Sequence, residues 1–235
     1  MNTKKETAIQ ELEEAITRMA NLVLAQLSFL EKIIESHQEE NDSLLKAEIK
    51  NNEKELDRYE IEISDRFINI IVLFQPKASD LRKIVAIYRL SINLERIGDL
   101  VINVTDTVIE LKRTSEYRSM SQLLNNMFLG SSAMVEKSLL SFTNNDVDYA
   151  VWTIRNDEII DEMNKKLMLQ SLSKSKLDEK TRKSMNAYLE LKNTISDIER
   201  IADHATNIAE VTIYNLKGKD VRHSDYGSEE QQSGG

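Results

Sequence analysis

The sequence contains no cysteine and few of the residues that make tight turns. Its 235 residues include six glycines and one proline, where an average chain of this length would carry about 16 and about 12. Sandwiches and barrels need many turns, and α/β folds need glycine at the corners between strands and helices. The composition therefore disfavours both classes and favours an all-α protein of long helices.

Other absences narrow the function. Without cysteine the chain has no disulfides, no thiolate nucleophile and no Cys-ligated zinc or iron–sulfur centre. A net charge of -9 argues against nucleic-acid binding, which needs a positive surplus, and leaves cations and basic protein patches as partners. The N-terminus is unlike a signal peptide, and the longest apolar run, residues 67–74, is too short to cross a bilayer. We therefore expect a cytoplasmic protein without a membrane span.

Apolar side chains recur every three or four residues, which predicts six amphipathic helices. The stripe of the first helix is Ile9, Leu12, Ile16, Met19, Val23, Leu27, Leu30 and Ile34, and the seam of the third is Ile87, Leu90, Leu94, Ile97, Val101, Val104, Val108 and Leu111. Capping side chains at 41–43 and 143–146, and proline at 76, mark helix boundaries. The fifth helix is expected to end near residue 171, and the sixth runs from about 177 to Gly218.

The two halves of the chain carry matching motifs. Residues 94–103 and 198–207 agree at Glu, Arg, Ile, Asp and Asn, 104 positions apart. The same offset aligns Asn52 with Asn156 without a gap. An internal duplication of a three-helix unit is the expected cause.

The duplication predicts the domain organisation. Residues 1–113 form the first three-helix bundle and 114–218 the second, with a polar stretch near 113–118 between them. Residues 219–235 form a tail that we expect to be disordered. Short loops between long helices are typical of antiparallel bundles.

Repetition also selects among the acidic residues. The chain has 40 of them, so about seven pairs with four-residue spacing are expected by chance. Two such pairs recur at the offset: Glu53/Asp57 with Asp157/Asp161, and Glu95/Asp99 with Glu199/Asp203. Like charges four apart on a helix repel by about 0.2–0.5 kcal/mol, and a bound cation would reverse the sign.

These carboxylates predict a cation site. If those of the second helix face those of the third, they form an all-oxygen site suited to hard or borderline divalent metals. Asn103, Asn207 and His204 are candidate extra ligands. Because Glu95 and Asp99 lie opposite the apolar seam, we expect the metal near the surface. The alternative is a solvated charged face.

Enzyme classes find little support. A di-iron oxidase bundle needs Glu-x-x-His, and no glutamate precedes any of the three histidines by three positions. No Ser-His-Asp set, P-loop or glycine fingerprint is present. We expect a non-enzyme, and a dimerisation or coiled-coil module without metal stays open as an alternative.

We expect the apolar run at residues 67–74 to be buried between helices, with contact to a partner or membrane surface as the alternative.

The sequence resembles the PhoU family of phosphate-uptake regulators. The resemblance lies in Ser-Asp-Leu-Arg at 79–82, the motifs at 94–99 and 198–210, and the ending at 213–223, and it covers about residues 5–223. It implies two tandem three-helix bundles in a cytoplasmic homodimer or higher oligomer. It also implies a negative regulator of the phosphate regulon, which links the ATPase of the phosphate ABC transporter to a sensor histidine kinase.

The resemblance further implies multinuclear iron or zinc clusters. One would use Glu53, Asp57, Glu95 and Asp99, and the other Asp157, Asp161, Glu199 and Asp203. The second repeat lacks a match to Asp-Leu-Arg at 184–186, so the repeats can differ in partner contacts. A related domain occurs fused to sodium–phosphate cotransporters, which leaves an accessory to such a cotransporter as an alternative.

Overall fold

The computed structural model describes residues 2–36, 39–174 and 181–222, and all regular structure in these ranges is helical. The helices are α1 (Asn2–Glu35), α2 (Glu39–Phe74), α3 (Ala78–Leu111), α4 (Ser115–Arg118), α5 (Ser121–Asn144), α6 (Val147–Lys174) and α7 (Thr181–Lys217). The predicted all-α class is confirmed. Among the described helices, no stretch is long and apolar enough to cross a membrane.

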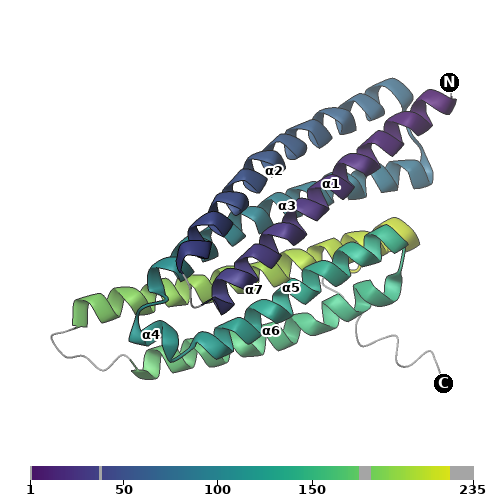
Figure 1. The fold of residues 1–235 in the computed structure, drawn as a ribbon. Coiled ribbons are helices and arrows are strands. Elements are labelled where there is room, and N and C mark those ends of the chain that lie inside the picture. The colour runs from purple at the N-terminus through teal and green to yellow at the C-terminus, as the bar shows by residue number, and fades with distance from the viewer. Residues whose placement is uncertain (1, 37–38, 175–180, 223–235) are drawn as a thin grey trace, which may run out of the picture.

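The helices form two three-helix bundles, as the duplication predicts. Helices α1, α2 and α3 pack together, and so do α5, α6 and α7. The bundles meet mainly through α3 and α7, which run antiparallel side by side, and also through α1 and α5 (Figure 1). Helices α2 and α6 therefore lie on the outer sides of the pair.

The apolar stripes explain this arrangement. Every residue of the predicted stripe of α1 and of the predicted seam of α3 is buried. Each buried Leu, Ile, Val or Met side chain contributes about 1.5–3 kcal/mol relative to an exposed one. The apolar cluster continues from the first bundle into the second, so the two repeats share one core.

The start of α2 differs from the expectation. The helix begins at Glu39, so the residues read as a break at 41–43 lie within it. Asp42 is buried, and its Oδ2 accepts a hydrogen bond from Lys112 Nζ at 2.8 Å. The side chain that suggests a cap instead forms an ion pair that joins the start of α2 to the end of α3.

Other boundaries follow the prediction. Helix α2 ends two residues before Pro76. Asn145 takes a left-handed conformation with φ 54 after α5. Asp146 Oδ1 then accepts from the backbone N–H groups of Asp148 and Tyr149, which caps the start of α6.

The connection between the repeats is itself folded. The polar stretch predicted near 113–118 contains the short helix α4. Thr114 caps it, because its Oγ1 accepts a hydrogen bond from the backbone N–H of Tyr117 at 3.2 Å. The Tyr117 side chain is buried in the core.

The apolar run at 67–74 is only half buried. Phe67 stacks on Tyr88 of α3 with ring centroids 4.5 Å apart. Ile68, Val72 and Leu73 are 53%, 66% and 66% exposed. The expectation of burial is wrong for this outer side, because the neighbours of α2 within the described part of the chain, α1 and α3, pack against its inner side.

The chain continues in contact with the second bundle after α7. Gly218 ends the helix with φ +67, as its sequence position predicts. Val221 is buried against Ala150 and Ile213. Of the tail expected to be disordered, residues 223–235 lie outside the described residues.

Candidate metal centre

The four acidic residues of the first repeat lie together between α2 and α3. Burial is the main cause that raises the pKa of Glu53 to about 7, and a hydrogen bond from Gln26 acts against it. The charges of Asp99, Asp57 and Glu95 raise the same pKa further. The predicted carboxylates of α2 and α3 therefore share one electrostatic environment.

Glu53 is held by a residue of α1. Gln26 Nε2 donates to Glu53 Oε2 at 3.0 Å and to the carbonyl oxygen of Ile49 at 3.1 Å. Gln26 is fully buried and Glu53 is 8% exposed. Within the described residues, Glu53 Oε1 and Gln26 Oε1 are buried and have no hydrogen-bond partner. An unsatisfied buried oxygen costs about 1–3 kcal/mol, so these atoms favour a ligand between the helices.

Gly98 makes room for this carboxylate. A Cβ atom at position 98 would lie 2.6 Å from Glu53 Oε2 and 2.7 Å from Leu56 Cδ1. Glycine in the Leu-Glu-Arg-Ile-Gly-Asp motif therefore lets the Glu53 carboxylate enter the helix interface without this close contact.

The set extends from the interior to the surface. The side chain of Glu95 is 17% exposed and that of Asp99 is 52% exposed. Arg96 lies at the rim, 3.5 Å from Glu95 Oε2 and 4.0 Å from Asp99 Oδ2. The expected position near the surface holds for Asp99, whereas Glu53 lies deeper than the sequence suggests.

The acidic residues of the second repeat lie together between α6 and α7. Burial raises the pKa of Asp157 against a hydrogen bond from Thr206, and Asp161 and Glu199 raise it further. Asp203 reaches solvent, yet desolvation of its carboxylate, followed by the charge of Asp157, raises its pKa to about 6. Both predicted sets are thus brought together by the fold.

The second set has its own polar supports. Thr206 Oγ1 donates to Asp157 Oδ1 at 3.1 Å. Asn164 Nδ2 donates to Glu199 Oε2, and Asn164 Oδ1 is buried without a hydrogen-bond partner among the described residues.

His204 lies beside the other repeat. Its Nδ1 is 3.0 Å from Oδ1 of Asn93, across the contact between α7 and α3. Burial is the main cause that lowers the pKa of His204 to about 4, and Arg200 and Arg96 lower it further. The ring is therefore neutral near pH 7, and its Nδ1 contacts an amide of the first repeat instead of a carboxylate of the second set.

The other candidate ligands lie outside the buried part of each set. Asn103 and Asn207 are exposed, one helical turn after Asp99 and Asp203. Neither forms a described contact that draws it toward the acidic residues.

Sequence reasoning missed four residues that shape these sets: Gln26, Glu60, Asn164 and Thr206. Glu60 follows Asp57 by three positions and lies on the same face of α2, and its charge contributes to the raised pKa of Glu95 after burial and Asp99. The seven-residue spacing from Glu53 to Glu60 could have identified it. Glu60 was left out because only acidic residues that recur in both repeats were selected, and its counterpart in the second repeat is Asn164.

The donor atoms suit a hard cation, although they are not gathered around one point. Within the described ranges, no three His, Asp or Glu side chains are arranged to hold an ion as they stand. The sets nevertheless offer carboxylate oxygens, and the first includes the unpartnered Oε1 of Glu53. The exposed carboxylates, such as Asp99, would have to rotate inward to join it.

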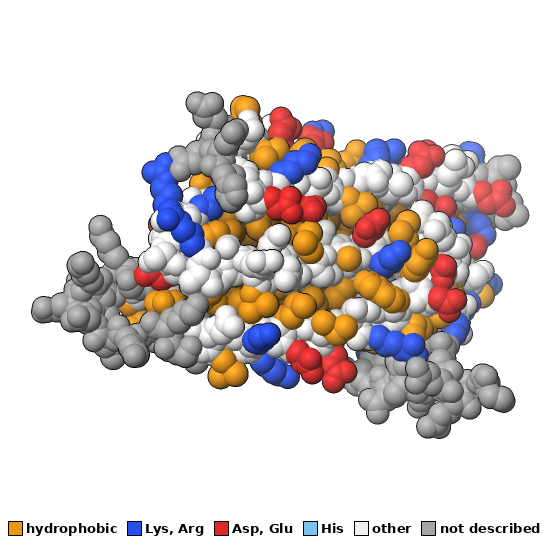
Figure 2. All heavy atoms as spheres, turned by 60° about the horizontal axis from the view of Figure 1, so that its bottom comes forward, with side chains coloured by type: hydrophobic (Ala, Val, Ile, Leu, Met, Phe, Trp, Pro, Cys, Tyr) orange, Lys and Arg blue, Asp and Glu red, His pale blue; other side chains and the backbone are white. Residues whose placement is uncertain are grey.

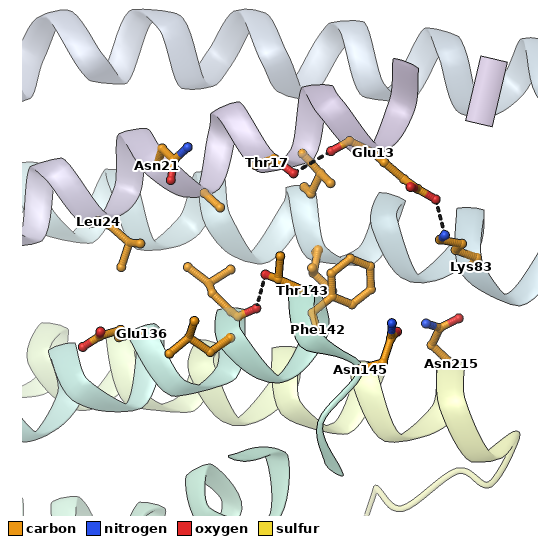
Figure 3. A pocket seen from close by; sticks show the side chains of 15 residues that line it. Glu13, Thr17, Asn21, Leu24, Lys83, Glu136, Phe142, Thr143, Asn145 and Asn215 are labelled. Atoms are coloured by element: carbon orange, nitrogen blue, oxygen red, sulfur yellow. Dashed lines mark hydrogen bonds and ion pairs between the residues drawn. The ribbon is translucent and has the colours of Figure 1, made fainter. Parts of the chain in front are cut away.

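A separate cavity lies between the repeats. It has a volume of about 440 Å³ and is lined by residues of α1, α3, α5 and α7. Figure 3 shows the ion pair of Glu13 with Lys83 at one side and Asn145 with Asn215 below it. No residue of either acidic set lines this cavity, so the two features are distinct.

Surface charges on one face are mixed. In the view of Figure 2, Lys and Arg side chains are interspersed with Asp and Glu, and hydrophobic side chains form bands along the helices. The charges drawn on this face do not form the positive stripe that nucleic-acid binding needs.

Comparisons with known proteins agree with this architecture. The family model for the PhoU domain matches twice, at residues 16–108 and 124–212. A "Phosphate-specific transport system accessory protein PhoU homolog 1" of Thermotoga maritima is 28% identical over 211 residues, which cover 90% of this chain and 88% of the relative. The protein named "Phosphate-specific transport system accessory protein PhoU" of Escherichia coli is 28% identical over 215 residues, covering 92% and 86%.

Solved structures show the same fold. The crystal structure of PhoU from Pseudomonas aeruginosa matches with a TM-score of 0.81 at 25% identity, covering 91% of this chain and 99% of that one. The structure from Streptococcus pneumoniae matches with a TM-score of 0.76 at 24% identity, over 92% and 99%. With two family domains that span most of its length, the chain belongs to the PhoU family.

Proposed function

We propose that this protein is a non-enzymatic regulator of phosphate uptake. It lowers phosphate-regulon signalling when phosphate is plentiful, by linking the ATPase of a phosphate ABC transporter to a sensor histidine kinase in the cytoplasm. The observation that carries the proposal is the whole-length match to relatives named as phosphate-specific transport system accessory proteins. These names point to a transporter partner, and the kinase link is part of the proposal.

The two acidic sets give the regulator its metal sites. Iron or zinc would be held by the carboxylates of α2 and α3 in the first repeat and of α6 and α7 in the second. The raised pKa values of Glu53 and Asp203, each due first to desolvation and then to neighbouring acids, support this assignment. A cation would neutralise the repulsion and hold each helix pair together.

Partner contacts would use the outer helices. Ile68, Val72 and Leu73 expose apolar surface on α2, which supports a contact with a partner or with a second copy of the chain. A homodimer or higher oligomer is part of the proposal.

A reporter of the phosphate regulon tests the function. In cells grown with abundant phosphate, deletion of the protein should raise reporter expression, and the wild-type protein should restore repression. A reporter that stays repressed after deletion contradicts the proposal. A pull-down from the same cells should recover the transporter ATPase or the kinase.

A further inference from the structure

The two acidic sets differ at the positions that surround the shared motif. The repeat offset pairs Glu60 with Asn164 and Gln26 with Gly130. The first set thus has an acid and a buried amide where the second has an amide and no side chain. These differences change both the charge of each set and the way in which its acids are held.

Glu60 adds a fifth carboxylate to the four of the first set. Glu53, Asp57 and Glu60 follow one face of α2 with spacings of four and three. Glu95 and Asp99 face them from α3, and the charge of Glu60 acts on Glu95. Glu60 is half-buried on this face of α2.

The buried end of the first set has an oxygen that lacks a partner. Gln26 fixes Oε2 of Glu53 at 3.0 Å. Glu53 is 8% exposed, and its Oε1 has no hydrogen-bond partner in the described part of the chain. This unpartnered oxygen is evidence for a ligand that does not depend on the number of carboxylates in the set. A cation can bind the oxygen where the protein provides no hydrogen-bond donor.

The second set has four carboxylates, and two of their oxygens already accept hydrogen bonds from protein side chains. Asn164 donates to Glu199 Oε2, where the first set has the acid Glu60. Thr206 donates to Asp157 Oδ1 at 3.1 Å. A Cβ atom at position 130 would lie 2.8 Å from Ile160 Cδ1, and the glycine there provides no side chain that could hold Asp157 as Gln26 holds Glu53.

The rim arginines do not cancel the difference. Arg96 is 3.5 Å from Glu95, and its side chain is 57% exposed. Ion pairs at such exposure contribute about 0–1 kcal/mol, so a cation can displace the guanidinium. Arg200 forms its ion pair with Asp197, outside the second set, and its charge also acts on Asp203.

We propose that the two acidic sets are unequal cation sites, and that the first binds a hard cation more tightly and fills first. Glu60 supplies its fifth carboxylate, and Gln26 is a positioning residue that aims Glu53 at the cation. The inference rests on the metal role in the proposed function, and it adds two residues and an order of filling.

The difference in affinity between the two sites can be tested by titrating the full-length protein with Mn²⁺ alone. The electron paramagnetic resonance signal of free Mn²⁺ measures how much of the ion stays unbound. Glu199→Ala/Asp203→Ala leaves the first site, and Glu95→Ala/Asp99→Ala leaves the second. The first-site protein should bind Mn²⁺ about tenfold more tightly, since affinity rises with the charge and number of oxygen ligands. Glu60→Gln should remove most of this difference, and the reverse change, Asn164→Glu, should strengthen the second site.

Gln26→Met tests positioning, because methionine fills the space without donating a hydrogen bond. In the variant that keeps only the first site, Gln26→Met should weaken Mn²⁺ binding severalfold. In the variant that keeps only the second site, it should leave Mn²⁺ binding unchanged. A general folding defect would weaken Mn²⁺ binding in both variants. Equal dissociation constants for the two sites, with no effect of Glu60→Gln or Asn164→Glu, would overturn the inequality. Equal weakening of both sites by Gln26→Met would overturn the positioning role. If neither site binds Mn²⁺, Fe²⁺ or Zn²⁺, the metal role in the proposed function fails as well.

Discussion

Gly98 of α3 lies so close to Glu53 of α2 that a Cβ atom at position 98 would be 2.6 Å from the Glu53 carboxylate. The second repeat has Ala202 and the shorter Asp157 at the corresponding positions. The first repeat therefore combines the longer acid, Glu53, with the smaller residue, Gly98. The second combines the shorter acid, Asp157, with the larger residue, Ala202. Both helix interfaces thus keep a carboxylate at this position.

Gly98→Ala should destabilise the protein. The added methyl group meets Glu53 Oε2 and Leu56 Cδ1, and such overpacking exceeds the gain in helix propensity, for a net cost of about 1–2 kcal/mol. Urea unfolding measures the difference in the free energy of unfolding.

A second substitution tests the cause. Glu53→Asp in the Gly98→Ala background should restore part of the lost stability, because it recreates the combination found in the second repeat. As a control, Ala202→Gly should cost about 1 kcal/mol through helix propensity, plus about 0.8 kcal/mol for the buried methyl group that it removes. If Gly98→Ala is as stable as the wild type, the close contact does not determine the residue at this position.

The acidic sets show what repetition in a sequence can and cannot reveal. The offset identified all eight motif carboxylates, because duplication preserves the α2–α3 and α6–α7 interfaces. It could not identify Gln26, which reaches Glu53 from α1 across 27 residues of sequence. A contact between helices leaves no local spacing, and its counterpart in the second repeat is Gly130.

In the absence of metal, stability should fall as pH rises toward neutrality. The pKa of Glu53 is raised from 4.5 to about 7 in the folded protein, mainly by burial. The folded state therefore holds this proton more tightly than the unfolded chain does. The stabilisation is complete below about pH 4.5 and is lost as pH rises through about 7, on the order of 3 kcal/mol. Asp203, with its pKa raised to about 6, contributes with the same sign.

Urea unfolding in EDTA between pH 4.5 and pH 8 measures this dependence. Glu53→Gln should flatten the curve, because its amide does not titrate. Identical pH slopes for Glu53→Gln and the wild type would contradict the buried position of the acid.

The contact between His204 and Asn93 should stabilise the packing of the two repeats. Asn93→Leu leaves the ring nitrogen of the half-buried His204 without its partner, at a cost of about 1 kcal/mol. Thermal unfolding should show a lower midpoint for Asn93→Leu, whereas Asn207→Leu, at an exposed position, should leave it near the wild-type value. Equal midpoints for Asn93→Leu and the wild type would show that the contact adds no stability.

Lys112→Met should be among the more damaging single changes outside the acidic sets. Asp42 is 3% exposed, and loss of its partner at 2.8 Å leaves a buried charge that costs about 3–5 kcal/mol. The double variant Asp42→Leu/Lys112→Met should recover much of this loss in urea unfolding. A double variant less stable than Lys112→Met alone would be inconsistent with this explanation.

The helices themselves were predictable because their apolar spacing is regular. The stripes of α1 and α3 are buried along their length, as their periodicity predicts. Asp42 shows the limit: an acid near a helix start is typical of a cap, and only the fold brings Lys112 beside it. Similarly, the run 67–74 indicates a buried helix, but it does not reveal that α2 has one uncovered side.

Metal content provides the most direct test of the two sites. The protein should be purified without chelators and analysed by elemental mass spectrometry, together with the variant Glu95→Ala/Asp99→Ala/Glu199→Ala/Asp203→Ala. Asp106→Ala/Glu110→Ala is the matched control, because this pair has the same spacing on α3 and no acidic counterpart pair in the second repeat. We expect iron or zinc in the wild type and in the control, and its loss from the fourfold variant. Equal metal in all three proteins, or none in the wild type after incubation with Fe²⁺ or Zn²⁺, would contradict the assignment of the acidic sets as metal sites.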